Sequence, residues 1–134
     1  METAFLTVEI TTPQKKWIFD DVLNCSVPGI MGNFQVLFNH APLLSELEMG
    51  VVKLETSSGV NYYATSGGFL EVLNNRVPLL LETCEAANKI DIGRAKQAAD
   101  RARKRLKEQS GDIDIARAEA ALKRALNRIH VAKK

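Results

Sequence analysis

Six arginines in the last third of the chain have a spacing that could bind a polyanion. Residues advance by about 100° along an α-helix, so positions seven or eleven apart fall on nearly one line. Planar guanidinium groups match phosphate oxygens, and two such stripes on antiparallel helices would converge on a polyphosphate. Outward-facing arginines are also often only solvated, so the spacing alone leaves both interpretations open. The stripes are Arg94, Arg101 and Arg105, followed by Arg117, Arg124 and Arg128.

The apolar residues among these arginines predict two helices that position them. In the first, Asp91 stands at the N-cap and Gln109-Ser110-Gly111 at the expected end. The second would begin near Asp112 or Asp114, and two helices joined by about four residues run antiparallel. The first apolar face consists of Ala95, Ala98, Ala99, Ala102 and Leu106. The second consists of Ile115, Ala118, Leu122, Ala125 and Ile129, flanked by Ala121 and Leu126.

Alanine dominates both of these faces. It has a high helix propensity, but its methyl group contributes little apolar area to an interface. We therefore expect the helical hairpin to be marginally stable by itself, and to dock on another surface or to open readily.

The composition of the chain changes near residue 90. Residues 1–90 carry five Lys or Arg against ten Asp or Glu, a net charge of −5, whereas residues 91–134 carry thirteen against six, a net charge of +7. All aromatic residues and all prolines lie in the first part. The change predicts two modules, residues 1–88 and 89–134, with separate roles. The overall charge of +2 is too small to indicate a nucleic-acid-binding protein.

Period-two alternation in the first module predicts short strands separated by turns. Asn74-Asn75 fits a tight hairpin, since Asn tolerates positive φ, and Gly67-Gly68 marks a positive φ or a close approach of strands. The predicted fold class is α+β in two modules: an N-terminal all-β sandwich or barrel, then an antiparallel two-helix hairpin. The expected strands are Phe5–Ile10, Trp17–Phe19, Val22–Val27, Phe34–Phe38, Val51–Glu55, Val60–Thr65, Phe69–Leu73 and Val77–Thr83.

The first module contains no constellation that predicts catalysis or metal binding, and we expect its exposed face to be a docking surface. His40 is expected to be a loop residue whose ring hydrogen-bonds its own turn. Cys25 and Cys84 have no His or Cys at ligand spacing, and we expect buried free thiols in a reducing compartment. The first ten residues predict a strand and not a signal peptide, and no apolar run approaches the ~20 residues of a membrane span. A soluble protein is expected, with any membrane role exercised through partners.

Three segments together resemble the epsilon subunit of bacterial F-type ATP synthases. These are Asn39-His40-Ala41-Pro42-Leu43-Leu44, Ser66-Gly67-Gly68-Phe69-Leu70-Glu71-Val72 and Ile90-Asp91-Ile92-Gly93-Arg94-Ala95, in this order. The resemblance covers essentially the whole chain, and its division into sandwich and hairpin agrees with the change in composition. The segment from Gly32 to Asn39 departs from it, because the family usually has a second glycine and a proline there.

The resemblance implies a non-catalytic central-stalk (rotor) subunit of a proton-translocating F-type ATP synthase, without a required cofactor or metal. The sandwich would bind the gamma subunit and the proteolipid ring, and so help to couple proton flow to ATP synthesis. The hairpin would be an intrinsic inhibitor of ATP hydrolysis that extends into the catalytic alpha/beta head. The implied location is the cytoplasmic face of the cell membrane, peripheral through the complex.

In some members of that family the folded hairpin binds ATP as a regulatory ligand, through an Ile/Leu-Asp-x-x-Arg-Ala motif. This chain matches the motif at Ile90, Asp91, Arg94 and Ala95, which favours ATP binding over simple solvation of the arginines. By that similarity Glu85, Ile90, Asp91 and Ala95 would surround the adenosine. Arg94, Arg101, Arg124 and Arg128 would meet the phosphates, with Arg117 as a supporting charge. Asp91 keeps two interpretations, helix cap and nucleoside ligand, which different oxygens could satisfy.

Two other classes of function fit the sequence less well. A nucleic-acid-binding protein with a basic helical tail is the alternative, but such proteins usually place aromatic or long apolar side chains among the basic ones. A small β-domain enzyme is disfavoured because no nucleophile is paired with a base.

Overall fold

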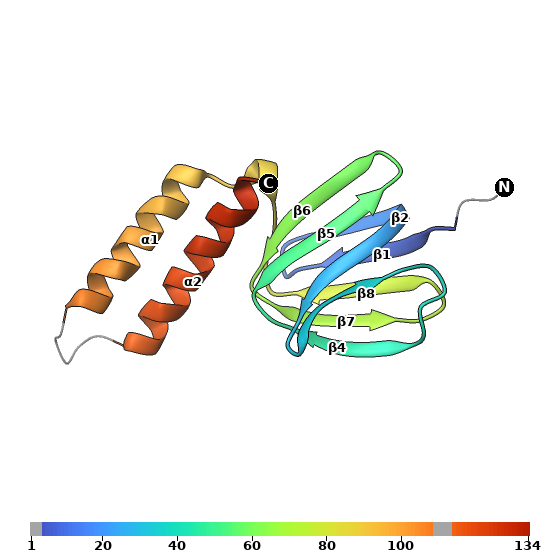
Figure 1. Cartoon of the computed structure of the whole chain (residues 1–134), viewed down its shortest axis with the longest axis horizontal. Coiled ribbons are helices and arrows are strands. Elements are labelled where there is room, and N and C mark those ends of the chain that lie inside the picture. Colours follow the sequence, from blue (N-terminus) through green and yellow to red (C-terminus); the bar gives the residue numbers. More distant parts are fainter. Residues whose placement is uncertain (1–3, 109–113) are drawn as a thin grey trace. The chain divides into compact units, whose positions relative to one another are not determined.

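A computed structural model describes residues 4–108 and 114–134, and the chain divides after Glu85 into two compact units. The first unit is built from strands and the second from two helices, so the predicted fold class is confirmed (Figure 1). The strands are β1 (Leu6–Thr11), β2 (Lys16–Gly29), β3 (Gly32–Val36), β4 (Leu43–Leu47), β5 (Gly50–Thr56), β6 (Gly59–Thr65), β7 (Gly68–Val72), β8 (Arg76–Leu81) and β9 (Cys84–Ala86).

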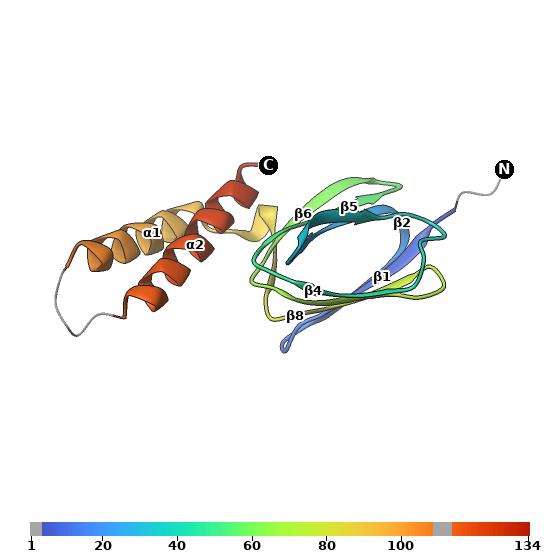
Figure 2. The same ribbon diagram turned by 60° about the horizontal axis from the view of Figure 1, so that its bottom comes forward.

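The long strand β2 joins the two layers of the sandwich. Its first half pairs with β1 and its second half with β3 and β5, and Gly29 at its end pairs with Leu47 of β4. The order β1-β8-β7-β4-β2 is therefore closed by the β1–β2 pairing, and β5, β6 and β9 extend from β2. Figure 2 shows β5 and β6 in one layer and β4 and β8 in the other.

Alternating side chains from both layers fill the core. In β1, Leu6, Val8 and Ile10 are buried while the residues between them are half-buried. This alternation is what a sheet with one face in the core and one face outward requires. The largest fully buried side chains are aliphatic: Leu6, Ile10, Leu54, Leu70 and Leu79, with seven valines.

Two predicted turns have the expected backbone. Asn74 and Asn75 take φ values of 51° and 63°, and Leu73 and Arg76 exchange two backbone hydrogen bonds of 3.0 Å around them, as in a two-residue hairpin. Gly68 has a φ of 155°, and a Cβ there would lie 1.9 Å from the Leu80 carbonyl oxygen. Only glycine fits this close approach of β7 to β8.

The structure corrects several predicted elements. Trp17–Phe19 and Val22–Val27 belong to one strand, β2, which a shift in register bends between Val22 and Asn24. Strand β4 was not predicted, because Leu43-Leu44 lack alternation after Pro42, and the short strand β9 was not predicted either. Cys25 is buried as predicted, but Cys84 in β9 is only half-buried, so the prediction of two buried thiols was wrong for Cys84.

The second unit contains a short 3₁₀ helix, η1 (Ala87–Lys89), and two α-helices, α1 (Ile92–Lys107) and α2 (Ile115–Ala132). The helices pack side by side and run in opposite directions (Figure 1). Asp91 and Asp114 are the N-caps, each carboxylate accepting a hydrogen bond from the amide three residues on. This confirms Asp91 as a cap and selects Asp114 as the start of α2. Asp112 and the predicted stop at Gln109-Ser110-Gly111 lie outside the described residues.

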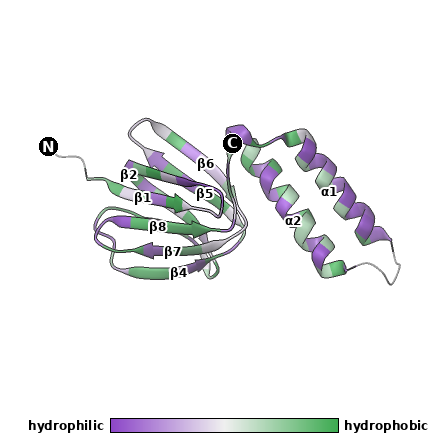
Figure 3. Cartoon of the chain, turned by 180° about the vertical axis from the view of Figure 1, so that it is seen from behind, coloured by the Kyte–Doolittle hydropathy of each residue, from purple (hydrophilic) through white to green (hydrophobic). Residues whose placement is uncertain are grey.

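Alanines form most of the buried face of the hairpin, as predicted. Ala95, Ala99 and Ala102 are buried on α1, and Ala118, Ala125 and Val131 on α2. The prediction was wrong for Ile115, which is 61% exposed in the first turn of α2, and Leu126 is 41% exposed. Hydrophilic colour covers much of α1 in Figure 3. In the described part of the chain, no helix has the length and apolar character that crossing a membrane requires.

Candidate functional site

The first turn of α1 is built around Asp91. Its Oδ1 atom accepts a hydrogen bond of 3.1 Å from the Arg94 amide, and its backbone carbonyl accepts one of 3.0 Å from the Ala95 amide. These bonds satisfy donors that a helix start leaves without a partner. The Asp91 side chain is exposed, so a ligand can reach the carboxylate while Oδ1 caps the helix.

The arginine stripes lie on one side of the hairpin. Arg94 and Arg101 each directly precede a buried alanine of α1, and Arg117 and Arg124 each precede a buried alanine of α2. Each stripe is therefore displaced by one residue step, about 100°, from the contact face and in the same rotational sense. Because the helices are antiparallel and their contact faces oppose each other, equal displacements bring both stripes to the same side.

Along the hairpin, the arginines are not all close together. Arg94 lies in the first turn of α1, and Arg124 and Arg128 lie in the second half of α2, which ends beside the start of α1. Arg117 is in the first turn of α2, about 16 Å along the helix axis from Arg128 at ~1.5 Å per residue. The folded hairpin thus places Arg94 and Arg128 toward one end and Arg117 at the other, while Arg101 and Arg124 lie near the middle of their helices.

The remaining residues of the predicted nucleotide site differ in accessibility. Arg94, Arg101 and Arg124 are exposed and Arg128 is half-buried. Ile90 and Ala95 are buried, so the Ala95 methyl group offers no surface to a ligand in this conformation. Glu85 is half-buried in β9 and belongs to the first unit. Within the described ranges, no three His, Cys, Asp or Glu side chains are grouped as a metal ion would require.

The outer face of the β4–β7–β8 sheet is a second candidate site, which the sequence predicted only as an exposed face without naming its residues. Leu44, Phe69 and Leu80 project outward from three adjacent strands and are 74%, 52% and 57% exposed. Phe69 lies opposite Leu80 on one side and Glu46 on the other. Apolar side chains gathered in this way mark a contact surface. The run Leu79-Leu80-Leu81, apolar on both faces of its strand, was the available sequence signal.

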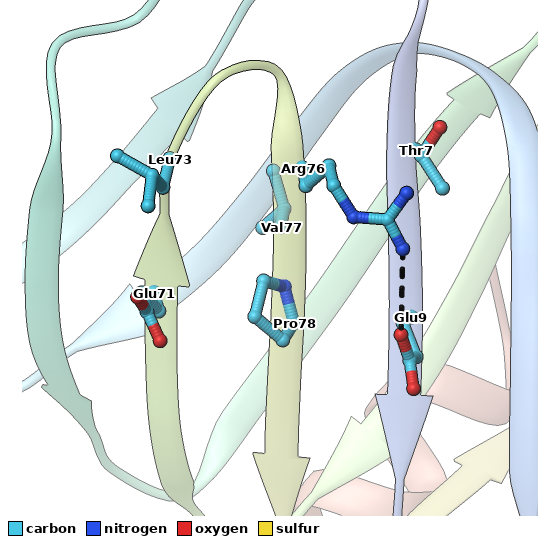
Figure 4. Close-up of a pocket in the computed structure, with 7 residues that line it drawn as sticks. All are labelled: Thr7, Glu9, Glu71, Leu73, Arg76, Val77 and Pro78. Atoms are coloured by element: carbon cyan, nitrogen blue, oxygen red, sulfur yellow. Dashed lines mark ion pairs between the residues drawn. The ribbon is translucent and has the colours of Figure 1, made fainter.

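A groove on this face follows β8 and is lined by Thr7, Glu9, Glu71, Leu73, Arg76, Val77 and Pro78. Its volume of about 180 Å³ is smaller than the ~300–1,000 Å³ of small-molecule pockets. Figure 4 shows the Arg76 guanidinium reaching toward the Glu9 carboxylate, from which Nη2 lies 3.9 Å away. The groove suits a side chain of a protein partner better than a nucleotide.

Glu9 is the centre of a small ion network beside this groove. The Lys16 ammonium lies 2.6 Å from Glu9 Oε1. The hydrogen bond from Lys16 lowers the pKa of Glu9, with smaller contributions from the charges of Lys16 and Arg76. The network links β1, β2 and β8 across the outer face.

Neither His40 nor the cysteines form a reactive site. His40 Nδ1 lies 2.7 Å from the Ala41 carbonyl oxygen, which confirms the predicted bond of the ring to its own turn. Burial raises the pKa of both Cys25 and Cys84 to about 12. Thiols with such a pKa are poor nucleophiles near neutral pH.

Comparison with known proteins agrees with this architecture unit by unit. Residues 5–87 match the family described as "ATP synthase, Delta/Epsilon chain, beta-sandwich domain", and residues 88–133 match "ATP synthase, Delta/Epsilon chain, long alpha-helix domain". The chain is 42% identical to the ATP synthase epsilon chain of Syntrophomonas wolfei, covering 99% of this chain and 97% of that one. It is 43% identical to the epsilon chain of Salinibacter ruber, covering 95% and 91%.

Among solved structures, the fold is similar to a chain of the Euglena gracilis mitochondrial ATP synthase (OSCP/F1/c-ring), with a TM-score of 0.83 at 21% identity. That match covers 98% of this chain and 83% of the other. A chain of the central stalk and c-ring of the Tetrahymena thermophila mitochondrial ATP synthase matches with a TM-score of 0.63 at 18% identity, covering 98% and 97%. A β-sandwich followed by two helices is thus the architecture of an ATP synthase subunit. The chain belongs to the ATP synthase delta/epsilon family, and the resemblance to epsilon subunits is confirmed.

Proposed function

We propose that this chain is a non-catalytic subunit of the central stalk of a proton-translocating F-type ATP synthase, and helps to couple proton flow to ATP synthesis. The observation that carries the proposal is the identity of 42% with an epsilon chain over nearly the full length of both chains. The solved neighbours support it, since their titles name F1, the c-ring and the central stalk. As part of such a complex the chain would be peripheral to the membrane, on its cytoplasmic face.

The sandwich docks this subunit to the gamma subunit and to the proteolipid ring. The apolar outer face around Leu44, Phe69 and Leu80 supports a protein contact, because removing exposed apolar side chains from water lowers the free energy of the complex. The exposed carboxylates of Glu46 and Glu71 on the same face favour a partner that presents basic groups beside its apolar ones.

The hairpin regulates the complex as a switch that ATP holds closed. Arg94 and Arg128 lie toward the end of the hairpin where Asp91 caps α1, and Arg124 follows one turn along α2, so these guanidinium groups would meet the phosphates. A ligand that binds only the folded hairpin stabilises it by RT ln(1 + [L]/Kd), so ATP disfavours the extended, inhibitory form. At low ATP concentration, the weakly packed alanine interface would allow the helices to separate and engage the catalytic head.

Isothermal titration of the full chain with ATP tests the nucleotide site. We expect binding to weaken by at least ~100-fold in Arg124→Ala/Arg128→Ala, because each charge-assisted hydrogen bond contributes about 1.5–3 kcal/mol. The matched control, Lys96→Ala/Lys123→Ala, removes the same charge from positions outside the stripes and should bind like the wild type. Asp91→Asn keeps the cap while removing the carboxylate charge, and so separates the two roles of Asp91. Unchanged affinity in the arginine double variant would contradict the site assignment.

Deletion of residues 91–134 tests the regulatory role in the assembled complex. We expect the truncated subunit to assemble with gamma, since the sandwich is a separate compact unit, while ATP hydrolysis by the complex increases. The measurements are co-purification with gamma and steady-state ATPase activity. Failure to assemble would show instead that the hairpin is needed structurally.

A further inference from the structure

Two asparagines far apart in the sequence form a reciprocal amide bridge at one end of the sandwich. The Asn39 backbone amide donates a hydrogen bond of 2.6 Å to Asn75 Oδ1, and Asn75 Nδ2 donates one of 3.3 Å to Asn39 Oδ1. Both residues have left-handed backbones, with φ values of 64° and 63°. The Asn75 carbonyl also accepts a bond of 2.9 Å from the Thr7 amide, so three chain segments meet at Asn75.

The bridge joins the two chain segments that lead to the open end of a groove on the outer face. One wall is Pro42, Leu43 and Leu44, at the start of β4, and the other is Glu71, Val72 and Leu73, at the end of β7. Backbone pairing between these strands extends only as far as Leu43 and Val72. Beyond that pair, Asn39 lies on the segment that precedes β4 and Asn75 on the segment that follows β7. The two hydrogen bonds between these asparagines connect the segments where strand pairing has ended.

The groove lies within the surface that we propose to bind the gamma subunit. Leu44 on one wall and Leu73 on the other are exposed, at 74% and 47%. The loop that Asn39 anchors also exposes Leu37 and Phe38. Strand pairing fixes the walls from Leu43 and Val72 onward, so the bridge matters for the unpaired ends at Pro42 and Leu73. If those ends were ordered only on binding, the affinity for the partner would be reduced.

We propose that the Asn39–Asn75 bridge is the positioning element of this groove, and that Asn75 sets the affinity of the sandwich for an apolar, basic-flanked segment of the gamma subunit. This rests on the docking role proposed above.

The two adjacent asparagines of the hairpin turn provide a matched pair of variants in the full chain. Asn75→Gly keeps a residue that tolerates the left-handed backbone but removes both bonds of the bridge. Asn74→Gly makes the same change one position earlier and keeps both bonds. We expect the Asn39 amide to exchange with solvent at least ~10-fold faster in Asn75→Gly, because its acceptor is lost, and at the wild-type rate in Asn74→Gly.

Affinity for purified gamma subunit supplies the second measurement. We expect Asn75→Gly to bind about 10-fold more weakly with an unchanged thermal midpoint, whereas a purely structural role would lower the midpoint as well. Asn75→Asp keeps the Oδ1 acceptor for the Asn39 amide and should recover most of the affinity. In the double variant Asn39→Gly/Asn75→Gly the loss should equal that of Asn75→Gly alone, because the bridge can be broken only once.

The outcomes separate this inference from the docking role. Unchanged exchange at Asn39 in Asn75→Gly would show that the bridge does not hold the loop. Faster exchange with unchanged affinity for gamma would overturn the positioning role and leave the docking role standing. Failure of the wild-type chain to bind gamma would overturn both.

Discussion

The two units of this protein bury side chains of different size. The sandwich encloses leucine, isoleucine and valine side chains from two layers, many of them fully buried, whereas the hairpin encloses mainly alanine methyl groups. Apolar burial contributes roughly 25 cal/mol per Å², so an alanine contributes much less than a leucine. The sandwich should hold one conformation, and the hairpin should change conformation at a small cost in free energy.

The surfaces of the two units also differ, one being apolar and fixed in shape and the other charged and movable. The sandwich presents an apolar outer face with a fixed geometry, maintained by strand pairing, the Glu9 network and the Asn39–Asn75 bridge. The hairpin presents arginines that a change in helix packing would move. The outer face of the sandwich is therefore suited to a permanent protein contact, and the arginines of the hairpin are suited to a charged ligand that binds reversibly.

The largest expected effect is in the sandwich core. Leu70→Ala should lower the free energy of unfolding of the sandwich by about 2–5 kcal/mol, because Leu70 is fully buried and its loss leaves a cavity. Denaturant unfolding followed by Trp17 fluorescence measures it. Leu80→Ala, at an exposed position, should change that free energy by less than ~0.5 kcal/mol. Equal losses in the two variants would contradict the assigned core.

The next effect concerns the hairpin interface. Ala99→Leu places a larger side chain at a buried position and should destabilise helix packing by about 1–3 kcal/mol. Hydrogen exchange of the α1 and α2 amides should then be faster, while that of the sandwich stays unchanged. Ala116→Leu, at an exposed position of α2, is the control and should leave exchange as in the wild type. Faster exchange in the sandwich as well would show that the two units do not behave independently.

The smallest effect concerns the pH dependence of the outer face. Because Lys16 lowers the pKa of Glu9, the ionised carboxylate stabilises the folded state above its unfolded pKa of about 4.3. That stabilisation is lost as the pH falls through the pKa of Glu9 in the folded state, which is lower than the unfolded pKa. The difference in stability between wild type and Glu9→Gln should therefore be constant near neutral pH and shrink in acid. Lys16→Gln should raise the pKa of Glu9 in an NMR titration, and no change would exclude Lys16 as its cause.

The sequence predicted those features that depend on local chemistry. The cap at Asp91, the alanine faces, the Asn74-Asn75 turn and the Gly67-Gly68 constraint each follow from one residue type in one backbone setting, whereas the start of α2 was left open between Asp112 and Asp114. Helical spacing predicted the nucleotide site only as a set of arginines, and the family resemblance added Glu85, Ile90, Asp91 and Ala95. Neither indicates how far apart these residues lie along the hairpin. The predicted residues remain a proposal, and the structure adds that Arg117 lies at the far end.

Features that depend on pairing between distant strands were not predictable. Nothing in Lys16–Gly29 shows that one strand serves both layers, because the bend arises from pairing with β1 on one edge and β5 on the other. The outer face could have been predicted only if β4, β7 and β8 were known to be neighbours. The Asn39–Asn75 bridge joins residues 36 positions apart, and neither asparagine identifies its partner.

The parallel pairing of β1 with β8 has a consequence for biosynthesis. Thr7 pairs with Arg76, so the first strand cannot complete its layer until almost the whole sandwich has been translated. Contacts so distant in sequence slow folding, whereas the contacts of the hairpin join neighbouring helices and form fast. As the nascent chain emerges, the first strand must wait for the eighth. The helices are translated last and need no such wait, so the part of the protein that changes conformation should be the last to appear and among the quickest to fold.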